Sequence, residues 1–263
     1  TRMDVIAAGD HPPIPCTTSD CRQRIVALVW RPGTAQVLFT AQDRHLNQSL
    51  YLWDTMTGRT RRVVASDGTL GGDRDGRTPC AVAPAVAVCV ASSAVSPPQL
   101  VRIDLETGAR TTLFDPNARL RQATMPIVER LAWRTAEGDE FTGTLLLPPV
   151  GRRQGLPLFL NYYHYGGFMS GSVGDELPFL PMAAAGMAVA CINLPPPANI
   201  EDNVGRYEQG LRAVRSLIGL LGERGTIDRA RVGMAGLSFG SEVTMWTLVH
   251  SDLLAAAAIA SSQ

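Results

Sequence analysis

Short stretches rich in apolar residues alternate with polar turns in the first part of the chain. Four of them follow one another at residues 25–30, 35–40, 49–53 and 61–65, separated by residues that favour turns. Short apolar runs bounded by turn residues are typical of β-strands. We therefore expect four consecutive strands, the number that forms one blade of a β-propeller.

An internal echo extends this pattern. Trp53-Asp54-Thr55-Met56-Thr57-Gly58 is matched by Ile103-Asp104-Leu105-Glu106-Thr107-Gly108, with the two aspartates 50 positions apart. Propeller repeats have periods of about 40–50 residues, so residues 1–140 are interpreted as the C-terminal blades of a partial propeller. A closed propeller needs about four blades, and the missing ones are expected before Thr1. The alternative is two unrelated hairpins, because Asp-x-x-Thr-Gly is an ordinary turn.

From Phe141 the pattern changes to alternating strands and helices. Strands are expected at 141–147, 156–163, 188–192, 231–235 and 255–260, and helices at 179–185, 203–221 and 242–250. Apolar residues of the long helix recur at helical spacing and give it one face to lay against a sheet. Residues 141–263 are therefore predicted to form a doubly wound, mostly parallel α/β sheet.

Charge and composition exclude some classes of function. The chain has 263 residues and a formal net charge of zero, and every basic residue is an arginine. No basic run points to nucleic acid or to an anionic membrane. The apolar run at 253–260 is far shorter than the ~20 residues that span a bilayer. We expect a globular protein without a membrane span or a nucleic-acid partner.

Five cysteines bear on metal binding and on compartment. Cys16 and Cys21 lie close in the sequence, as do Cys80 and Cys89, and both pairs are either disulfides or buried thiols. Cys191 lies in a predicted core strand. The spacings do not form a zinc site, and we expect neither a metal nor a cofactor. The compartment stays open, with the bacterial periplasm favoured over the cytoplasm.

The strongest chemical motif is Gly236-Leu237-Ser238-Phe239-Gly240. A strand is expected before it and a helix after it, which is the context of a nucleophile elbow. Ser238 is therefore the candidate nucleophile, and the alternative is a tight structural turn. In an α/β-hydrolase the acid and the histidine follow the serine, so we expect both beyond Gln263. This chain alone is then expected to be a truncated and inactive part of the domain. His164 is interpreted as a loop residue and His250 as a helix-terminal residue.

A second motif, Tyr163-His164-Tyr165-Gly166-Gly167-Phe168, follows a strong apolar strand. Loops in this position supply the second oxyanion donor of α/β-hydrolases. Together with the β-rich N-terminal part and the segment from Asp228 to Gly240, this loop resembles the prolyl oligopeptidase family of serine peptidases. Those proteins carry a β-propeller in front of an α/β-hydrolase domain.

The resemblance implies roles for individual residues. The Tyr165 hydroxyl and the backbone N–H of Phe239 would stabilise the oxyanion, and Phe168 with Gly166 and Gly167 would bind substrate. Gly166-Gly167-Phe168, the segment 171–176, Pro79-Cys80, Cys89-Val90 and Pro97-Pro98 resemble bacterial lasso peptide isopeptidases. Those enzymes hydrolyse the isopeptide bond of a threaded lasso peptide. One departure is Gly240-Ser241, where many members of the family have two glycines.

Three functions remain in competition. The first is a serine isopeptidase or a related oligopeptidase, dipeptidyl peptidase or acylaminoacyl peptidase. The second is an esterase with the same elbow, and the third is a non-catalytic binding protein that carries a propeller. A peptide substrate is the expected partner in the first case.

Overall fold

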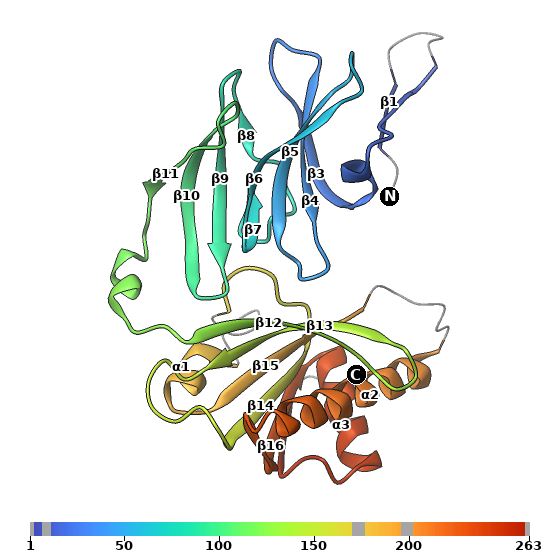
Figure 1. The fold of residues 1–263 in the computed structure, drawn as a ribbon, viewed down its shortest axis with the longest axis vertical. Coiled ribbons are helices and arrows are strands. Elements are labelled where there is room, and N and C mark those ends of the chain that lie inside the picture. Colours follow the sequence, from blue (N-terminus) through green and yellow to red (C-terminus); the bar gives the residue numbers. More distant parts are fainter. Residues whose placement is uncertain (1–2, 7–11, 170–176, 196–201, 261–263) are drawn as a thin grey trace. The chain divides into compact units, whose positions relative to one another are not determined.

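The computed structural model describes residues 3–6, 12–169, 177–195 and 202–260. Its contacts divide the chain into two compact units (Figure 1). The first comprises Thr1–Gln122 with Gly166–Phe168, and the second comprises Ala123–Tyr165 with Met169–Gln263. Each unit has its own fold and its own hydrophobic core.

The first unit contains two larger antiparallel sheets. Strands β3 (Arg24–Trp30), β4 (Gln36–Gln42), β5 (Gln48–Asp54) and β6 (Thr60–Ala65) pair in the order of the sequence. These are the four strands that the sequence predicts between its turns, confirmed to within two residues at each end.

A second sheet follows with the order β11-β10-β9-β7. It consists of β7 (Gly68–Gly71), β9 (Val86–Ser93), β10 (Ser96–Asp104) and β11 (Arg110–Phe114), and the short β8 (Ala81–Val82) pairs with β9. The remaining elements of the unit are β1 (Asp4–Val5), β2 (Ile14–Pro15), and the 3-10 turns η1 (Ser19–Arg22) and η2 (Ala118–Gln122).

Strand alternation gives the first unit two clusters of buried side chains. Leu38 and Leu50 belong to a cluster that includes residues of β9 and β10, whereas Phe39 and Trp53 belong to one with the N-terminal segment. Because successive side chains of a strand point to opposite faces, the first sheet is buried on both of its faces.

Both close cysteine pairs are disulfides. The Cα atoms of Cys16 and Cys21 are 5.9 Å apart, and those of Cys80 and Cys89 are 4.8 Å apart. These separations lie in the range that a bridge spans, so the question left open by the sequence is answered for both pairs. Cys191 is a free, buried thiol in the second unit.

The two copies of the Asp-x-x-Thr-Gly motif fold alike. In the β5–β6 turn, Asp54 Oδ1 accepts hydrogen bonds from the Thr57 N–H at 2.9 Å and the Thr57 hydroxyl at 3.0 Å. In the β10–β11 turn, Asp104 Oδ1 accepts from the Thr107 N–H at 2.9 Å and the Thr107 hydroxyl at 2.9 Å. The sequence repeat is therefore also a structural repeat. It forms the turn between the last two strands of each of two successive antiparallel sheets.

The second unit is built on one mixed sheet of six strands in the order β12-β13-β15-β14-β16-β17. The strands are β12 (Ile127–Arg134), β13 (Glu140–Leu147), β14 (Leu156–Tyr163), β15 (Ala188–Asn193), β16 (Ile227–Leu237) and β17 (Ala256–Ala260). The pairs β12–β13 and β13–β15 are antiparallel, and the other three pairs are parallel.

The boundary between the units lies earlier than the sequence indicated. We expected the change of fold between residues 140 and 141, whereas the contacts divide the chain between Gln122 and Ala123. The physical reason is β12, which pairs along its whole length with β13, from Ile127 opposite Leu147 to Arg134 opposite Glu140. Trp133 also stacks on Phe141 at a centroid distance of 5.8 Å.

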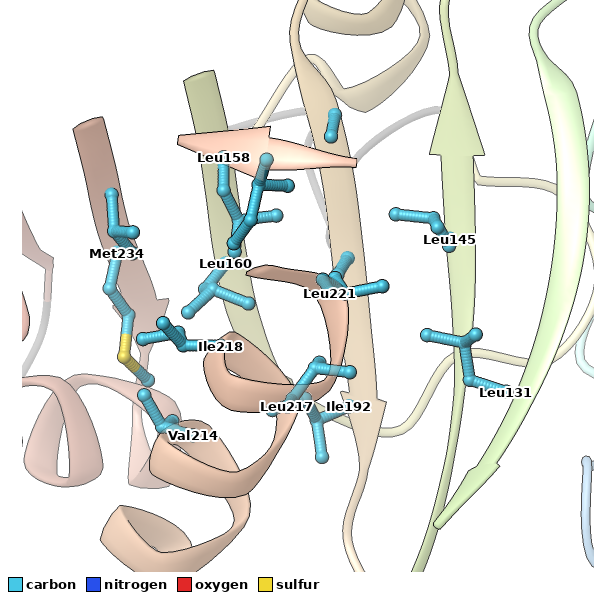
Figure 2. Close-up of a cluster of buried hydrophobic side chains, with 14 of the residues drawn as sticks. Leu131, Leu145, Leu158, Leu160, Ile192, Val214, Leu217, Ile218, Leu221 and Met234 are labelled. Atoms are coloured by element: carbon cyan, nitrogen blue, oxygen red, sulfur yellow. The ribbon is translucent and has the colours of Figure 1, made fainter. Parts of the chain in front are cut away.

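Helices cover both faces of this sheet. Leu217, Ile218 and Leu221 of α2 (Asn203–Glu223) enter a core with even-numbered residues of β14, including Leu158 and Leu160 (Figure 2). Phe159 points to the opposite face. It packs there against Phe179 of α1 (Phe179–Ala184).

Helix α3 (Phe239–His250) packs against α2, and Gly210 leaves the space for Val243. No helix within the described parts of the chain is long and apolar enough to cross a membrane.

Candidate active site

Three loops meet at one edge of the second unit's sheet. Strands β15, β14 and β16 are neighbours and run parallel, so their carboxyl ends lie together. Asn193 ends β15, Tyr165 follows β14, and Ser238 follows β16. In open α/β sheets, ligands bind outside the carboxyl ends of the strands.

Ser238 lies at the turn between β16 and α3, as the motif predicts. Its backbone has φ 52° and ψ −129°, and it is the N-cap residue of the helix. Such a conformation is costly for any residue other than glycine and persists only where the surrounding structure imposes it. The strand-turn-helix context is confirmed, and it holds a partly exposed serine in a strained conformation.

The two glycines of the motif provide space at this turn. A β-carbon on Gly236 would overlap the backbone of Gly240 and Ser241, and one on Gly240 would lie 2.8 Å from the Tyr162 carbonyl oxygen. Real side chains do not approach backbone atoms so closely, so neither position accepts alanine without a shift of the main chain. The motif therefore has a steric cause in this fold.

Ser241 stands where the resemblance leads one to expect a second glycine. Its side chain is fully buried, and its hydroxyl lies between the carbonyl oxygens of Gly236 and Ala260. The same hydroxyl accepts a hydrogen bond from the Ala260 N–H at 3.1 Å. Ser241 thus connects the start of the elbow with the end of β17.

Phe239 is the first residue of α3, where backbone N–H groups have no acceptor within the helix. Its ring lies 5.6 Å from the ring of Tyr207 and 6.4 Å from that of Tyr162. The Arg206 guanidinium lies 4.3 Å from the centre of the Phe239 ring. These contacts hold the residue whose N–H is the predicted oxyanion donor.

Tyr165 is buried and is held at both ends. Its N–H donates a hydrogen bond to Asn193 Oδ1 at 3.1 Å, and its hydroxyl donates to Asn161 Oδ1. Its ring packs edge-to-face on Phe179 with the centroids 5.2 Å apart. The Tyr165 hydroxyl is therefore fixed within the second unit beside β16, because Asn161 also donates to the Ala235 carbonyl at 2.6 Å.

The predicted substrate-binding residues belong to a different unit from Ser238 and Tyr165. By contacts, Gly166, Gly167 and Phe168 belong with the first unit, where a β-carbon on Gly167 would lie 2.8 Å from Thr69 Oγ1. Their role in binding substrate stays a prediction. The segment 171–176, which carried part of the resemblance, lies outside the described residues.

Two histidines are placed as the sequence suggested. His164 is exposed in the loop after β14, and its ring contacts Tyr163. His250 ends α3, stacks on Trp246 at 3.8 Å, and lies a helix of 12 residues from Ser238. At about 1.5 Å per residue that separation is about 18 Å, too far for proton transfer.

The pKa values of two tyrosines near the elbow are raised. Burial raises the pKa of Tyr162 far above its usual value. A hydrogen bond of 2.7 Å to Glu242 raises the pKa of Tyr207. Both hydroxyls are protonated at neutral pH, so neither is a base for Ser238. Within the described ranges, no cluster of His, Cys, Asp or Glu is placed to hold a metal ion.

Sequence reasoning missed Asn161 and Asn193. Both are buried polar side chains, 1% and 3% exposed, at the ends of apolar strands. A signal was present, since Asn161 interrupts the run Leu-Pro-Leu-Phe-Leu-Asn-Tyr-Tyr of β14. A polar residue in a buried strand needs a hydrogen-bond partner, and here the partner is the Tyr165 loop.

Comparisons with known proteins show what the chain as a whole is similar to. No family model matches the chain. It is 31% identical to the lasso peptide isopeptidase AtxE2 of Asticcacaulis excentricus over 98% of its own length and 38% of the relative. Solved structures of AtxE2 superpose with TM-scores of 0.82 for the apo form and 0.85 for a serine-to-alanine variant with Astexin3-dC4 bound. These cover 97% and 98% of this chain, at 29% and 30% identity, and 40% and 41% of AtxE2.

More distant structures share the fold. An acylaminoacyl peptidase of Pyrococcus horikoshii matches 95% of the chain and 39% of its own length, with a TM-score of 0.68 at 18% identity. The chain therefore spans about two fifths of the proteins it resembles. Over that span it is a homologue of the lasso peptide isopeptidase AtxE2, with the mixed α/β fold that prolyl oligopeptidase-family peptidases share.

Proposed function

We propose that the full-length protein containing this chain is a serine isopeptidase that opens the ring of a threaded lasso peptide. The observation that carries the chemistry is the strained Ser238 between β16 and α3. The substrate class rests on the similarity to AtxE2, whose variant structure contains Astexin3-dC4.

The proposed reaction is acyl transfer through a covalent intermediate. Ser238 Oγ attacks the isopeptide carbonyl while a general base removes its proton. The Tyr165 hydroxyl and the Phe239 N–H stabilise the oxyanion, and the amine leaves with a proton. Water then hydrolyses the ester, which returns Ser238 and leaves a free carboxylate and a free amine. No histidine of this chain is assigned as the base.

The domain arrangement is part of the proposal. The two antiparallel sheets of the first unit carry the same turn at the same point, which supports their assignment as propeller blades. The second unit is the N-terminal part of an α/β-hydrolase domain. Gly166, Gly167 and Phe168 would bind the peptide, and no cofactor is required. A structure of the full-length protein in which the two sheets do not lie around a common axis would contradict the propeller.

The experiment is a mass measurement on the full-length protein with a threaded lasso peptide and with the linear peptide of the same sequence. We expect the threaded peptide to gain the mass of one water, and its fragmentation to place the new carboxylate in the ring. Ser238→Ala should abolish the reaction, and Tyr165→Phe should lower kcat by about 10²–10³-fold. Cleavage of the linear peptide alone would mean a general oligopeptidase, and no reaction with either would mean a binding protein.

A further inference from the structure

Asn161 has no place in the mechanism above, yet its side chain joins two of the mechanism's parts. It is 1% exposed and lies in β14. Its Nδ2 donates to the Ala235 carbonyl at 2.6 Å, and its Oδ1 accepts the hydrogen bond from the Tyr165 hydroxyl. Ala235 precedes Ser238 by three residues in the strand that enters the elbow.

These two hydrogen bonds fix the orientation of the amide. A carbonyl oxygen such as that of Ala235 can only accept, so it must face the Asn161 NH₂ group. The amide oxygen then faces Tyr165. A tyrosine hydroxyl has a single proton, so that proton points to Asn161 in the resting structure and not to an oxyanion.

We propose that Asn161 is a positioning residue for Tyr165, an inference that rests on the proposed acyl transfer. Its amide ties the tyrosine hydroxyl to the strand that carries Ser238 and accepts a hydrogen bond from that hydroxyl between turnovers. When Ser238 attacks, the hydroxyl turns about its C–O bond and donates to the oxyanion. The O–H bond stays intact, so no proton leaves Tyr165 and only its acceptor changes.

The chemistry of asparagine suits this task. An aspartate at position 161 has nearly the same shape, but its carboxylate cannot donate to the Ala235 carbonyl. It also accepts a stronger hydrogen bond from a hydroxyl than a neutral amide does, so it competes with the oxyanion for the Tyr165 hydroxyl. An alanine would remove both hydrogen bonds and leave two buried polar groups without them.

The test is a double-mutant cycle in the full-length protein with Asn161→Ala and Tyr165→Phe, read as kcat and KM for ring opening. Asn161→Ala should lower kcat about tenfold, the equivalent of one hydrogen bond, with little change in KM. In the Tyr165→Phe background the same substitution should change kcat less than twofold, because the hydroxyl it positions is absent. Equal losses in both backgrounds would show a merely structural role and overturn the inference.

Two further variants guard against loss of folding. Asn161→Asp keeps the volume and should also lower kcat in the Tyr165 protein, and a kcat equal to wild type would contradict the inference. Thr144→Val is the matched control, since Thr144 is equally buried in the same sheet and accepts a hydrogen bond from Arg130. It should leave kcat unchanged, and a loss equal to that of Asn161→Ala would speak for a general effect of buried polar groups.

A fluorophosphonate probe separates this inference from the proposed function. The probe phosphonylates activated serines and also develops charge on an oxygen in the oxyanion site. If the labelling rates of Ser238 show the same non-additive double-mutant cycle, they would support the inference even if no lasso peptide is opened. A wild-type protein that the probe does not label would overturn both proposals, and a labelled protein with an additive cycle would overturn the role of Asn161 alone.

Discussion

The elbow at Ser238 and the two Asp-x-x-Thr-Gly turns each change the direction of the chain within a few residues, but they distribute glycine differently. In the two turns, Gly58 and Gly108 have φ of 71° and 74°, so the unusual conformation falls on the residue that adopts it freely. In the elbow the positive φ falls on Ser238, and the flanking glycines provide space instead.

The difference separates a turn built for stability from one built for chemistry. The first unit's turns are held by an aspartate that accepts two hydrogen bonds from a threonine, and nothing in them is strained. The elbow keeps a strained serine that a glycine would relieve. Strain that persists on a replaceable residue points to a use for that residue.

The largest expected effect on stability comes from filling the space inside the elbow. Gly236→Ala should lower the free energy of unfolding by about 3 kcal/mol, because the β-carbon overlaps main-chain atoms that cannot move aside. Denaturant unfolding of the full-length protein measures this. Gly219→Ala in α2 is the matched control, since no atom lies within 4 Å of its β-carbon, and it should be neutral or stabilising by up to about 1 kcal/mol. Equal effects of the two would remove the steric explanation.

The two turns themselves offer a paired test. Gly58→Ala places a side chain at positive φ at a cost of about 1 kcal/mol. Gly108→Ala carries the same cost and also drives the β-carbon against the Val63 carbonyl oxygen, whereas the space at Gly58 is open. We expect Gly108→Ala to be the more destabilising by about 1 kcal/mol or more in denaturant unfolding. The reverse order would mean that the turns are not equivalent in backbone.

Strain at Ser238 predicts an unusual ranking of variants. Ser238→Gly should be more stable than Ser238→Ala by about 1 kcal/mol, because glycine relieves the backbone strain at this position. The greater conformational entropy of glycine in the unfolded chain cancels only part of this stabilisation. Melting temperatures of the two inactive variants give the comparison. An alanine variant at least as stable as the glycine variant would argue that the elbow is not strained.

The smallest expected effect is on acid stability. The Thr57 and Thr107 N–H groups hold the pKa values of Asp54 and Asp104 below the ordinary value of 3.8. A carboxylate with a lower pKa in the folded state stabilises the fold fully above pH 3.8, and this contribution is lost as the pH falls through the folded pKa. On acidification, the melting temperature of the wild type should therefore fall further than that of the double variant Asp54→Asn/Asp104→Asn. Parallel pH curves would contradict this role.

Most of the fold follows from local pattern. The strand Leu156–Tyr163 and the start of the helix at Asn203 lie where the apolar period places them, because each buries its apolar face within its own unit. Differences arise where the helix or strand extends beyond its apolar core. Helix α3 begins at Phe239 and not at residue 242, because Ser238 itself is the N-cap residue of the helix.

The candidate site was less predictable than the fold. Ser238 and Tyr165 could be named because motif and loop position are readable along the chain. The hydrogen bonds of Asn161 and Asn193 could not, because they depend on which strands are neighbours and on which face each side chain lies. Strand β12 (Ile127–Arg134) was not predicted, and its pairing with β13 was missed with it.

The hydrogen bonds of Ser241 have a consequence for biosynthesis. A nascent chain whose last structured residue is His250 already contains Gly236, Ser238 and α3, but it lacks the Ala260 groups that the Ser241 hydroxyl contacts. The elbow therefore reaches its final hydrogen-bonded form only after β17 has left the ribosome and paired with β16.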